Sequence, residues 1–157
     1  MKRMCLSLAL SALVVGMAAS QPVRAADENA APKWTDNYKA AVSQAKKEKK
    51  MLLLDFTGSD WCGYCIKLHD MVFSKPEFSK WADKFVLVEL DFPQQKKLSD
   101  AVKAQNDQLQ KKYQIEGFPT VIILDASEKK LAETVGYGGE SPSKWMAAID
   151  DQVAKGK

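Results

Sequence analysis

Histidine and cysteine are scarce in this sequence, which limits the metal chemistry open to it. The 157 residues contain one histidine, His69, and three cysteines, Cys5, Cys62 and Cys65. Cys62, Cys65 and His69 are spaced to share one helical face, and thiolates with an imidazole suit zinc or copper(I). A closed structural zinc site needs a fourth ligand, which this set lacks. We therefore expect no metal site, and a surface or partly packed His69 is the simpler interpretation.

A long apolar run is missing after the first 25 residues. A basic start precedes the apolar stretch 6–19, which is short for a bilayer span. Val23-Arg24-Ala25 places small residues where a signal peptidase cuts, and no lipobox precedes a cysteine there. We expect a cleaved signal peptide over residues 1–25, a flexible leader over 26–33, and a periplasmic or secreted protein without stable membrane insertion. An uncleaved anchor is the alternative.

The predicted mature protein has no excess charge of either sign. Removal of residues 1–25 takes away three of the 23 basic side chains and none of the 20 acidic ones. The calculated pI of 8.7 therefore stems mostly from the signal and gives no support for nucleic acid as a partner. The remaining length suits one domain, which we expect over residues 34–157.

The two cysteines of the mature chain lie in the stretch Ser59–Lys67, between the strand-like run Met51–Phe56 and a helix. At a helix N-terminus, free N–H groups and the helix dipole favour the Cys62 thiolate, and such sites lower a thiol pKa from about 8.5 to roughly 3.5–7.5. Cys65, one turn deeper, can displace a mixed disulfide by closing a Cys62–Cys65 disulfide. In an exported protein, a lone Cys-x-x-Cys is more typical of redox chemistry than of a structural disulfide.

Hydrophobic periodicity and turn residues predict the order helix, strand, helix, strand, helix, strand, strand, helix. The predicted strands are Met51–Phe56, Phe85–Asp91, Val121–Asp125 and Leu131–Tyr137. The predicted helices begin after Thr35 as N-cap, at Cys62, at Leu98 and at Ser143, with a further short helix from Pro76. Strand-helix-strand steps call for parallel pairs, and the last two strands for an antiparallel hairpin. The expected fold class is α/β, with a mixed central sheet and helices on both faces.

Three motifs resemble those of the thioredoxin family in order and spacing, over about residues 34–155. They are Trp61-Cys62-Gly63-Tyr64-Cys65 after a buried strand, Gly117-Phe118-Pro119-Thr120 before the third strand, and Val135-Gly136 after the fourth. The segment 72–78 is similar to the exported and periplasmic branches, including the C-terminal domain of the transmembrane disulfide reductase. The resemblance implies the thioredoxin fold and a redox-active disulfide in place of a cofactor.

The resemblance also implies a role for each matching residue. Cys62 corresponds to the exposed attacking cysteine and Cys65 to the buried resolving one. Pro119 corresponds to the proline after a cis peptide bond that faces the disulfide, so that Phe118 can pair with an extended substrate segment. Gly136 corresponds to the loop across the groove, where the lack of a side chain permits close approach.

Two departures from the family pattern concern proton transfer and potential. Asp55 lies where relatives bury an acid that takes the proton of Cys65, but Thr57-Gly58-Ser59-Asp60 is a longer link than usual. The alternative is a strand-end aspartate bonded to backbone. The pair Gly63-Tyr64 has no histidine between the cysteines, which slightly favours a reductant.

The aromatic residues Trp61, Tyr64 and Phe118 could form an apolar rim for protein substrates, with Gly63 between the cysteines as part of that surface. For Trp61, packing against the helix is an equal alternative.

The sequence predicts an exported enzyme that reduces protein disulfides, recharged by a membrane electron donor and acting as a monomer. The alternatives are an oxidant or isomerase on the same scaffold, a metal-binding protein, or a redox-inert binding or chaperone module.

Overall fold

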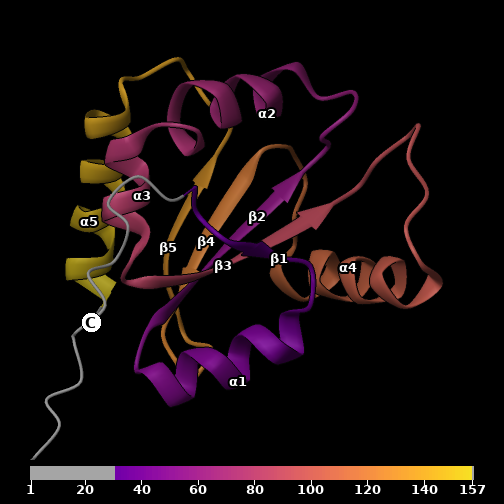
Figure 1. The fold of residues 1–157 in the computed structure, drawn as a ribbon, viewed down its shortest axis with the longest axis horizontal. Helices are drawn as coiled ribbons and strands as arrows, with labels where there is room; N and C mark the ends of the chain where they lie inside the picture. Colours follow the sequence, from indigo (N-terminus) through magenta and orange to yellow (C-terminus); the bar gives the residue numbers. More distant parts are fainter. Residues whose placement is uncertain (1–30, 157) are drawn as a thin grey trace, which may run out of the picture.

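Two strands, β2 (Met51–Thr57) and β3 (Phe85–Asp91), lie inside the sheet in the computed structural model, which describes residues 31–156 (Figure 1). They pair in parallel along their whole length. All of β2 after its first residue is buried, as a mainly apolar run predicts for a strand covered on both faces. The predicted signal peptide and residues 26–30 of the predicted leader lie outside the described residues.

The sheet has the strand order β1-β3-β2-β4-β5. The other strands are β1 (Trp34–Thr35), β4 (Thr120–Leu124) and β5 (Lys130–Val135). β4 runs antiparallel to both β2 and β5, which confirms the terminal hairpin and the mixed sheet. The expected parallel direction for the step from β3 to β4 was wrong. Thr120, the first residue of β4, pairs with Phe56 near the C-terminal end of β2. The chain therefore enters β4 at the end of the sheet where β3 stops.

Helices cover both faces of the sheet, as expected for this fold class (Figure 1). They are α1 (Tyr38–Glu48), α2 (Gly63–Leu68), the π-helical turn η1 (His69–Phe73), α3 (Pro76–Ala82), α4 (Asp100–Tyr113) and α5 (Pro142–Gly156). Leu53 packs in the layer formed with α2, η1, α3 and α5, whereas Leu52 and Leu54 pack with α1 and α4. Between residues 31 and 156, no helix is long and apolar enough to cross a membrane.

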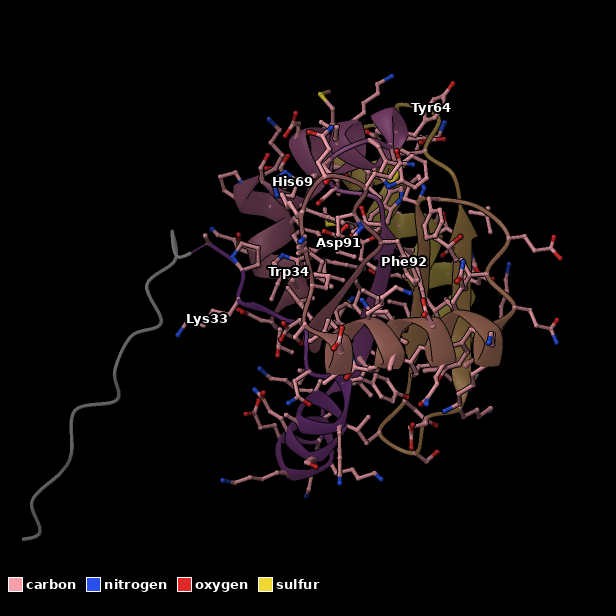
Figure 2. All side chains as sticks on the ribbon, turned by 90° about the vertical axis from the view of Figure 1, so that its right-hand side faces the viewer. Lys33, Trp34, Tyr64, His69, Asp91 and Phe92 are labelled. Atoms are coloured by element: carbon pink, nitrogen blue, oxygen red, sulfur yellow. A yellow bond between two sulfur atoms is a disulfide. The ribbon has the colours of Figure 1, made fainter. Side chains whose placement is uncertain are left out.

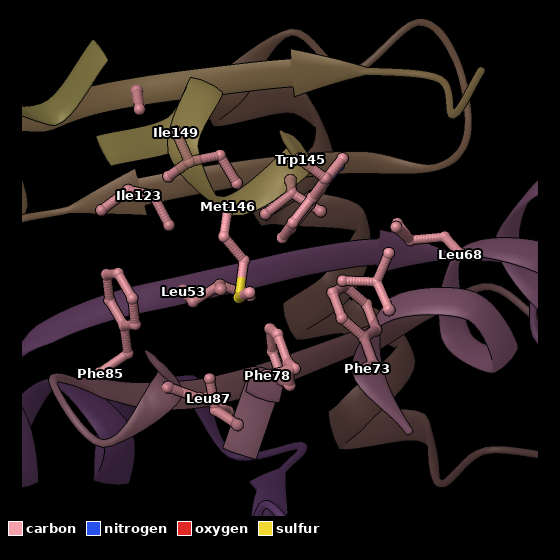
Figure 3. Close-up of a cluster of buried hydrophobic side chains, with 14 of the residues drawn as sticks. Leu53, Leu68, Phe73, Phe78, Phe85, Leu87, Ile123, Trp145, Met146 and Ile149 are labelled. Atoms are coloured by element: carbon pink, nitrogen blue, oxygen red, sulfur yellow. The ribbon is translucent and has the colours of Figure 1, made fainter. Parts of the chain in front are cut away.

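An aromatic cluster anchors the helix that follows the cysteines (Figure 3). The ring of Phe73 lies 4.8 Å from that of Phe78 and 5.6 Å from that of Trp145, measured between centroids. Trp34 of β1 closes the cluster at 5.1 Å from Phe73. Because Phe73 ends η1, these contacts hold the helical segment that begins at the cysteines against the sheet.

The ends of several elements differ from the prediction. Asn37, not Thr35, caps α1, and its side chain accepts the N–H of Ala40 at 2.9 Å. Thr35 instead belongs to β1, which the sequence analysis missed because two residues show no periodicity. Pro76 begins α3 as predicted, and Ser99 caps α4.

Candidate active site

The two cysteines form a disulfide at the beginning of α2. Cys62 is the N-cap of this helix, and its Sγ accepts the backbone N–H of Cys65 at 3.2 Å. The exposure difference expected between the two is small, because Cys62 is 7% and Cys65 4% exposed. A cap side chain turns back toward its helix, and so the oxidised Cys62 is not the exposed cysteine that the resemblance implied. A thiolate released at Cys62 would face the free N–H groups of the first turn.

The longer link before the cysteines is fixed by hydrogen bonds. The backbone N–H of Ser59 donates to Asp91 at 2.9 Å, and its hydroxyl donates to the same carboxylate at 2.6 Å. Asp60 accepts the backbone N–H groups of three consecutive residues, Gln94, Gln95 and Lys96, at 2.9, 2.8 and 3.0 Å. These bonds lower the pKa of Asp60, and the bond from Gln94 has the largest effect. The link therefore joins the motif to the loop after β3.

Trp61 stands at the edge of the motif in a row of aromatic rings. Its indole N–H donates to the carbonyl of Phe92 at 2.7 Å, and its ring meets that of Phe118 edge-on at 5.8 Å. Phe118 in turn lies 5.2 Å from Phe92, which is labelled in Figure 2. Trp61 remains 41% exposed. The ring is thus packed against Phe118 on one side and open on the other, and its part in a rim for protein substrates stays a prediction.

Gly58 makes room for this position of Trp61. A Cβ at residue 58 would lie 2.5 Å from the Trp61 ring, closer than atoms can approach. We expect Gly58→Ala to displace the indole from Phe118 and break its hydrogen bond to Phe92, with a loss of about 1–2 kcal/mol in stability. Tryptophan emission of the reduced and oxidised protein measures the displacement, and Trp61→Phe identifies the part of the signal that comes from residue 61. An unchanged Trp61 signal in Gly58→Ala would contradict this packing.

The opposite side of the motif is formed by the segment before β4. The Phe118–Pro119 peptide bond is cis, as the resemblance implied, and Pro119 is buried while Phe118 is half-buried. Gly136 has a φ of 76°, and its N–H donates to the carbonyl of Pro119 at 2.8 Å. The loop after β5 is thus tied directly to the proline, and a left-handed backbone there favours glycine.

Exposed apolar side chains surround the motif. Tyr64 is 64% exposed and lies at the outer edge of the molecule (Figure 2). Val135, just before Gly136, is 67% exposed, and a Cβ on Gly63 would meet no atom within 4 Å. The side chains of Tyr64 and Val135 are therefore open to solvent, and Gly63 leaves free space between the two cysteines.

Asp55 is buried in the centre of the sheet, on the face that carries α2. Its neighbours Leu54 and Phe56 point to the other layer, and across the sheet it pairs with Glu89 of β3 and Val121 of β4. Its Oδ1 has no hydrogen-bond partner within residues 31–156. Burial, and secondarily the charges of Glu89 and Asp91, raise the pKa of Asp55 well above its usual value. The alternative interpretation, an aspartate whose carboxylate is hydrogen-bonded to backbone at the end of the strand, therefore does not apply to Oδ1 of Asp55.

His69 is not drawn toward the cysteines. Its side chain is 62% exposed, and Nδ1 lies 3.2 Å from the carboxylate of Asp70 (Figure 2). In the part of the chain that the structure describes, no three His, Cys, Asp or Glu side chains are grouped to hold a metal ion.

A family model for a thioredoxin-like domain matches residues 38–152 of this chain. The chain belongs to the thioredoxin-like family. It is 35% identical over 118 residues to the disulfide bond reductase DsbH of Chlamydia pneumoniae, and the matched region covers 73% of this chain and 71% of DsbH. It is 32% identical over 111 residues to the thioredoxin-related protein DsbJ of the same organism, covering 70% of this chain but only 32% of DsbJ.

Solved structures place this thioredoxin-like protein in the same fold. A DsbH oxidoreductase superposes with a TM-score of 0.75 at 28% identity, covering 88% of this chain and 93% of the other. The oxidised C-terminal domain of Neisseria meningitidis DsbD superposes with a TM-score of 0.55 at 22% identity, covering 73% and 91%. With the Cys62–Cys65 pair on this fold, the protein is a thiol-disulfide oxidoreductase.

Several residues that shape the site of this thioredoxin-like protein escaped the sequence analysis. Gly58, Asp60 and Asp91 position the motif through packing and hydrogen bonds. The unusual length of the link was the signal for the first two, since extra residues in a tight connection need partners of their own. Phe92 contributes a backbone carbonyl, and since every residue carries one, the sequence gives no signal for this contact.

Proposed function

We propose that this protein is an exported reductant of protein disulfides. Cys62, as a thiolate, attacks a substrate disulfide and forms a mixed disulfide with it. Cys65 then attacks Cys62, which closes the intramolecular disulfide and releases the reduced substrate. The observation that carries the proposal is the Cys62 cap, since the first turn of the helix that would stabilise its thiolate also presents Cys65.

The exposed apolar groups support proteins as the substrates. An extended segment beside Phe118 and Pro119 would lie between Trp61 and the Val135–Gly136 loop. Gly63 leaves the space over the disulfide open, and Tyr64 adds an aromatic contact at the margin. We assign Trp61, Gly63, Tyr64, Phe118 and Gly136 to substrate binding.

We assign the proton of Cys65 to Asp55. The acid is buried on the sheet face over which α2 lies, and burial with nearby negative charge makes its carboxylate a strong base. It takes the proton as Cys65 attacks and returns it when the disulfide is reduced again.

Three observations support the direction of electron flow and the location. The predicted signal peptide, the absence of a histidine between the cysteines, and a relative named as a disulfide bond reductase all favour an exported reductant. In an oxidising compartment, such an enzyme needs an electron source, and the likeness to a domain of DsbD favours a membrane reductase as donor. We propose that the protein acts as a monomer.

The equilibrium reduction potential of the Cys62–Cys65 pair tests the direction. We expect a value near the thioredoxin end of the scale, about −270 mV, from tryptophan emission in thiol redox buffers. A value near −120 mV would make the protein an oxidant that donates its disulfide. The absence of any redox transition would favour the binding-module alternative.

A further inference from the structure

Asp55 has a second carboxyl group beside it. Asp55 and Glu89 are register partners on the parallel strands β2 and β3, so their side chains leave the sheet on the same face. Asp55 is 6% exposed and its Oδ1 has no hydrogen-bond partner among the described residues, whereas Glu89 is half-buried. On the other side of Asp55, Val121 offers only apolar surface. The two acids thus form a pair in which Asp55 is buried and Glu89 is partly exposed to solvent.

The charged groups around the pair act differently on Asp55 and on Glu89. Glu89 and Asp91 of β3 are the charged groups that act on Asp55. Burial and Asp91, with Asp36, raise the pKa of Glu89, but His69 and Lys96 on the outer side act in the opposite direction. When only one of two adjacent carboxyl groups can ionise easily, the charge settles on the more solvated one. That group is Glu89, and the proton therefore stays on Asp55.

We propose that Glu89 is a positioning residue of the thiol-disulfide cycle, whose carboxylate keeps the proton of the cycle on Asp55 while Cys62 and Cys65 are joined. The inference rests on the proposed proton role of Asp55.

The proton balance of the cycle follows from this arrangement. When a donor thiolate attacks the sulfur of Cys62, a donor–Cys62 disulfide forms and the Cys62–Cys65 bond breaks. The electron pair moves to Cys65, which takes the stored proton from Asp55. The second thiolate of the donor then attacks the donor sulfur of this mixed disulfide, which closes the donor disulfide and releases Cys62 as a thiolate. Cys62 next attacks the substrate disulfide, and one substrate thiolate leaves. Cys65 gives its proton back to Asp55 as it attacks Cys62 in the substrate–Cys62 disulfide, and the second substrate thiolate leaves. The electrons come from the donor dithiol and end on the substrate.

The pair can be titrated directly in the resting oxidised protein. Carboxyl-carbon NMR of ¹³C-labelled aspartate, with the Asp55 signal identified by its loss in Asp55→Asn, follows the ionisation of Asp55. In Glu89→Gln the neighbouring charge is gone, so we expect Asp55 to titrate at lower pH by about one unit or more. Glu77→Gln, which removes an exposed glutamate at the start of α3, should leave the titration unchanged.

Kinetics give a second readout. The pH profile of disulfide reduction by dithiothreitol should move to lower pH in Glu89→Gln, and the double variant Asp55→Asn/Glu89→Gln should superpose on Asp55→Asn alone. An Asp55 titration in Glu89→Gln that matches the wild type, or an equal shift in Glu77→Gln, would overturn the inference. The titration uses the resting protein, so it stands apart from the reduction potential that tests the proposed direction of electron flow.

Discussion

Cys62→Ser is expected to abolish thiol exchange, whereas Cys65→Ser is expected to trap the enzyme on its substrates. Without Cys62 no mixed disulfide forms, because the Cys62 sulfur is the one that caps α2 and faces the free N–H groups of its first turn. Without Cys65, release depends on an external thiol. An intramolecular attack can correspond to an effective concentration of about 10⁵ M or more, so release should slow by at least about 1,000-fold.

Non-reducing electrophoresis and mass spectrometry of the two variants, incubated with a disulfide-bonded protein, measure this difference. The double variant Cys62→Ser/Cys65→Ser is the control for non-specific binding, and neither Cys62→Ser nor the control should form covalent adducts. If Cys65→Ser accumulated no adduct while Cys62→Ser kept its turnover, the two roles would have to be exchanged.

The fold could be predicted from the sequence largely because β2 and β3 are strongly apolar. Such strands are typical of the interior of a sheet that is covered on both faces, and a helical connection between two neighbouring strands is typical of a parallel pair. The direction of β4 could not be deduced in the same way. It depends on how α4 crosses the sheet, and local periodicity carries no information on that path.

The site divides along similar lines. The cysteines, Pro119 and Gly136 are set by chemistry that only those residue types supply. The structure joins Cys62 to Cys65 and Gly136 to Pro119, and it gives Pro119 the cis peptide bond that the resemblance implied. The exposure of Cys62 and the placing of Trp61 were not predictable, since both depend on contacts with residues distant in sequence. Glu89 reads in the sequence as one polar residue in an apolar strand, and its partner becomes visible only through the register.

Asp55→Asn is expected to make the protein more stable at alkaline pH and slower in thiol exchange. The folded-state pKa of Asp55 lies above its unfolded value of about 3.9, so the native state binds more protons than the unfolded state between these two pKa values. The stability of the wild type therefore falls as pH rises through that window, and Glu89 adds a contribution of the same sign. Asparagine cannot ionise, which removes the Asp55 part of this loss.

The expected gain is about 1–3 kcal/mol at pH 8 to 9, because the unfolded wild type gains the free energy of ionising residue 55 at this pH and the unfolded variant does not. Urea unfolding of the oxidised protein at a series of pH values measures it, with the exposed Asp83→Asn as a control that should follow the wild type. The same variant should lose about 100-fold in thiol exchange, since it cannot carry the Cys65 proton. A variant that is stabilised yet fully active would separate burial from catalysis and assign Asp55 a purely structural role. Stabilisation with lost activity would show that the strand retains a destabilising acid because Cys65 needs a base.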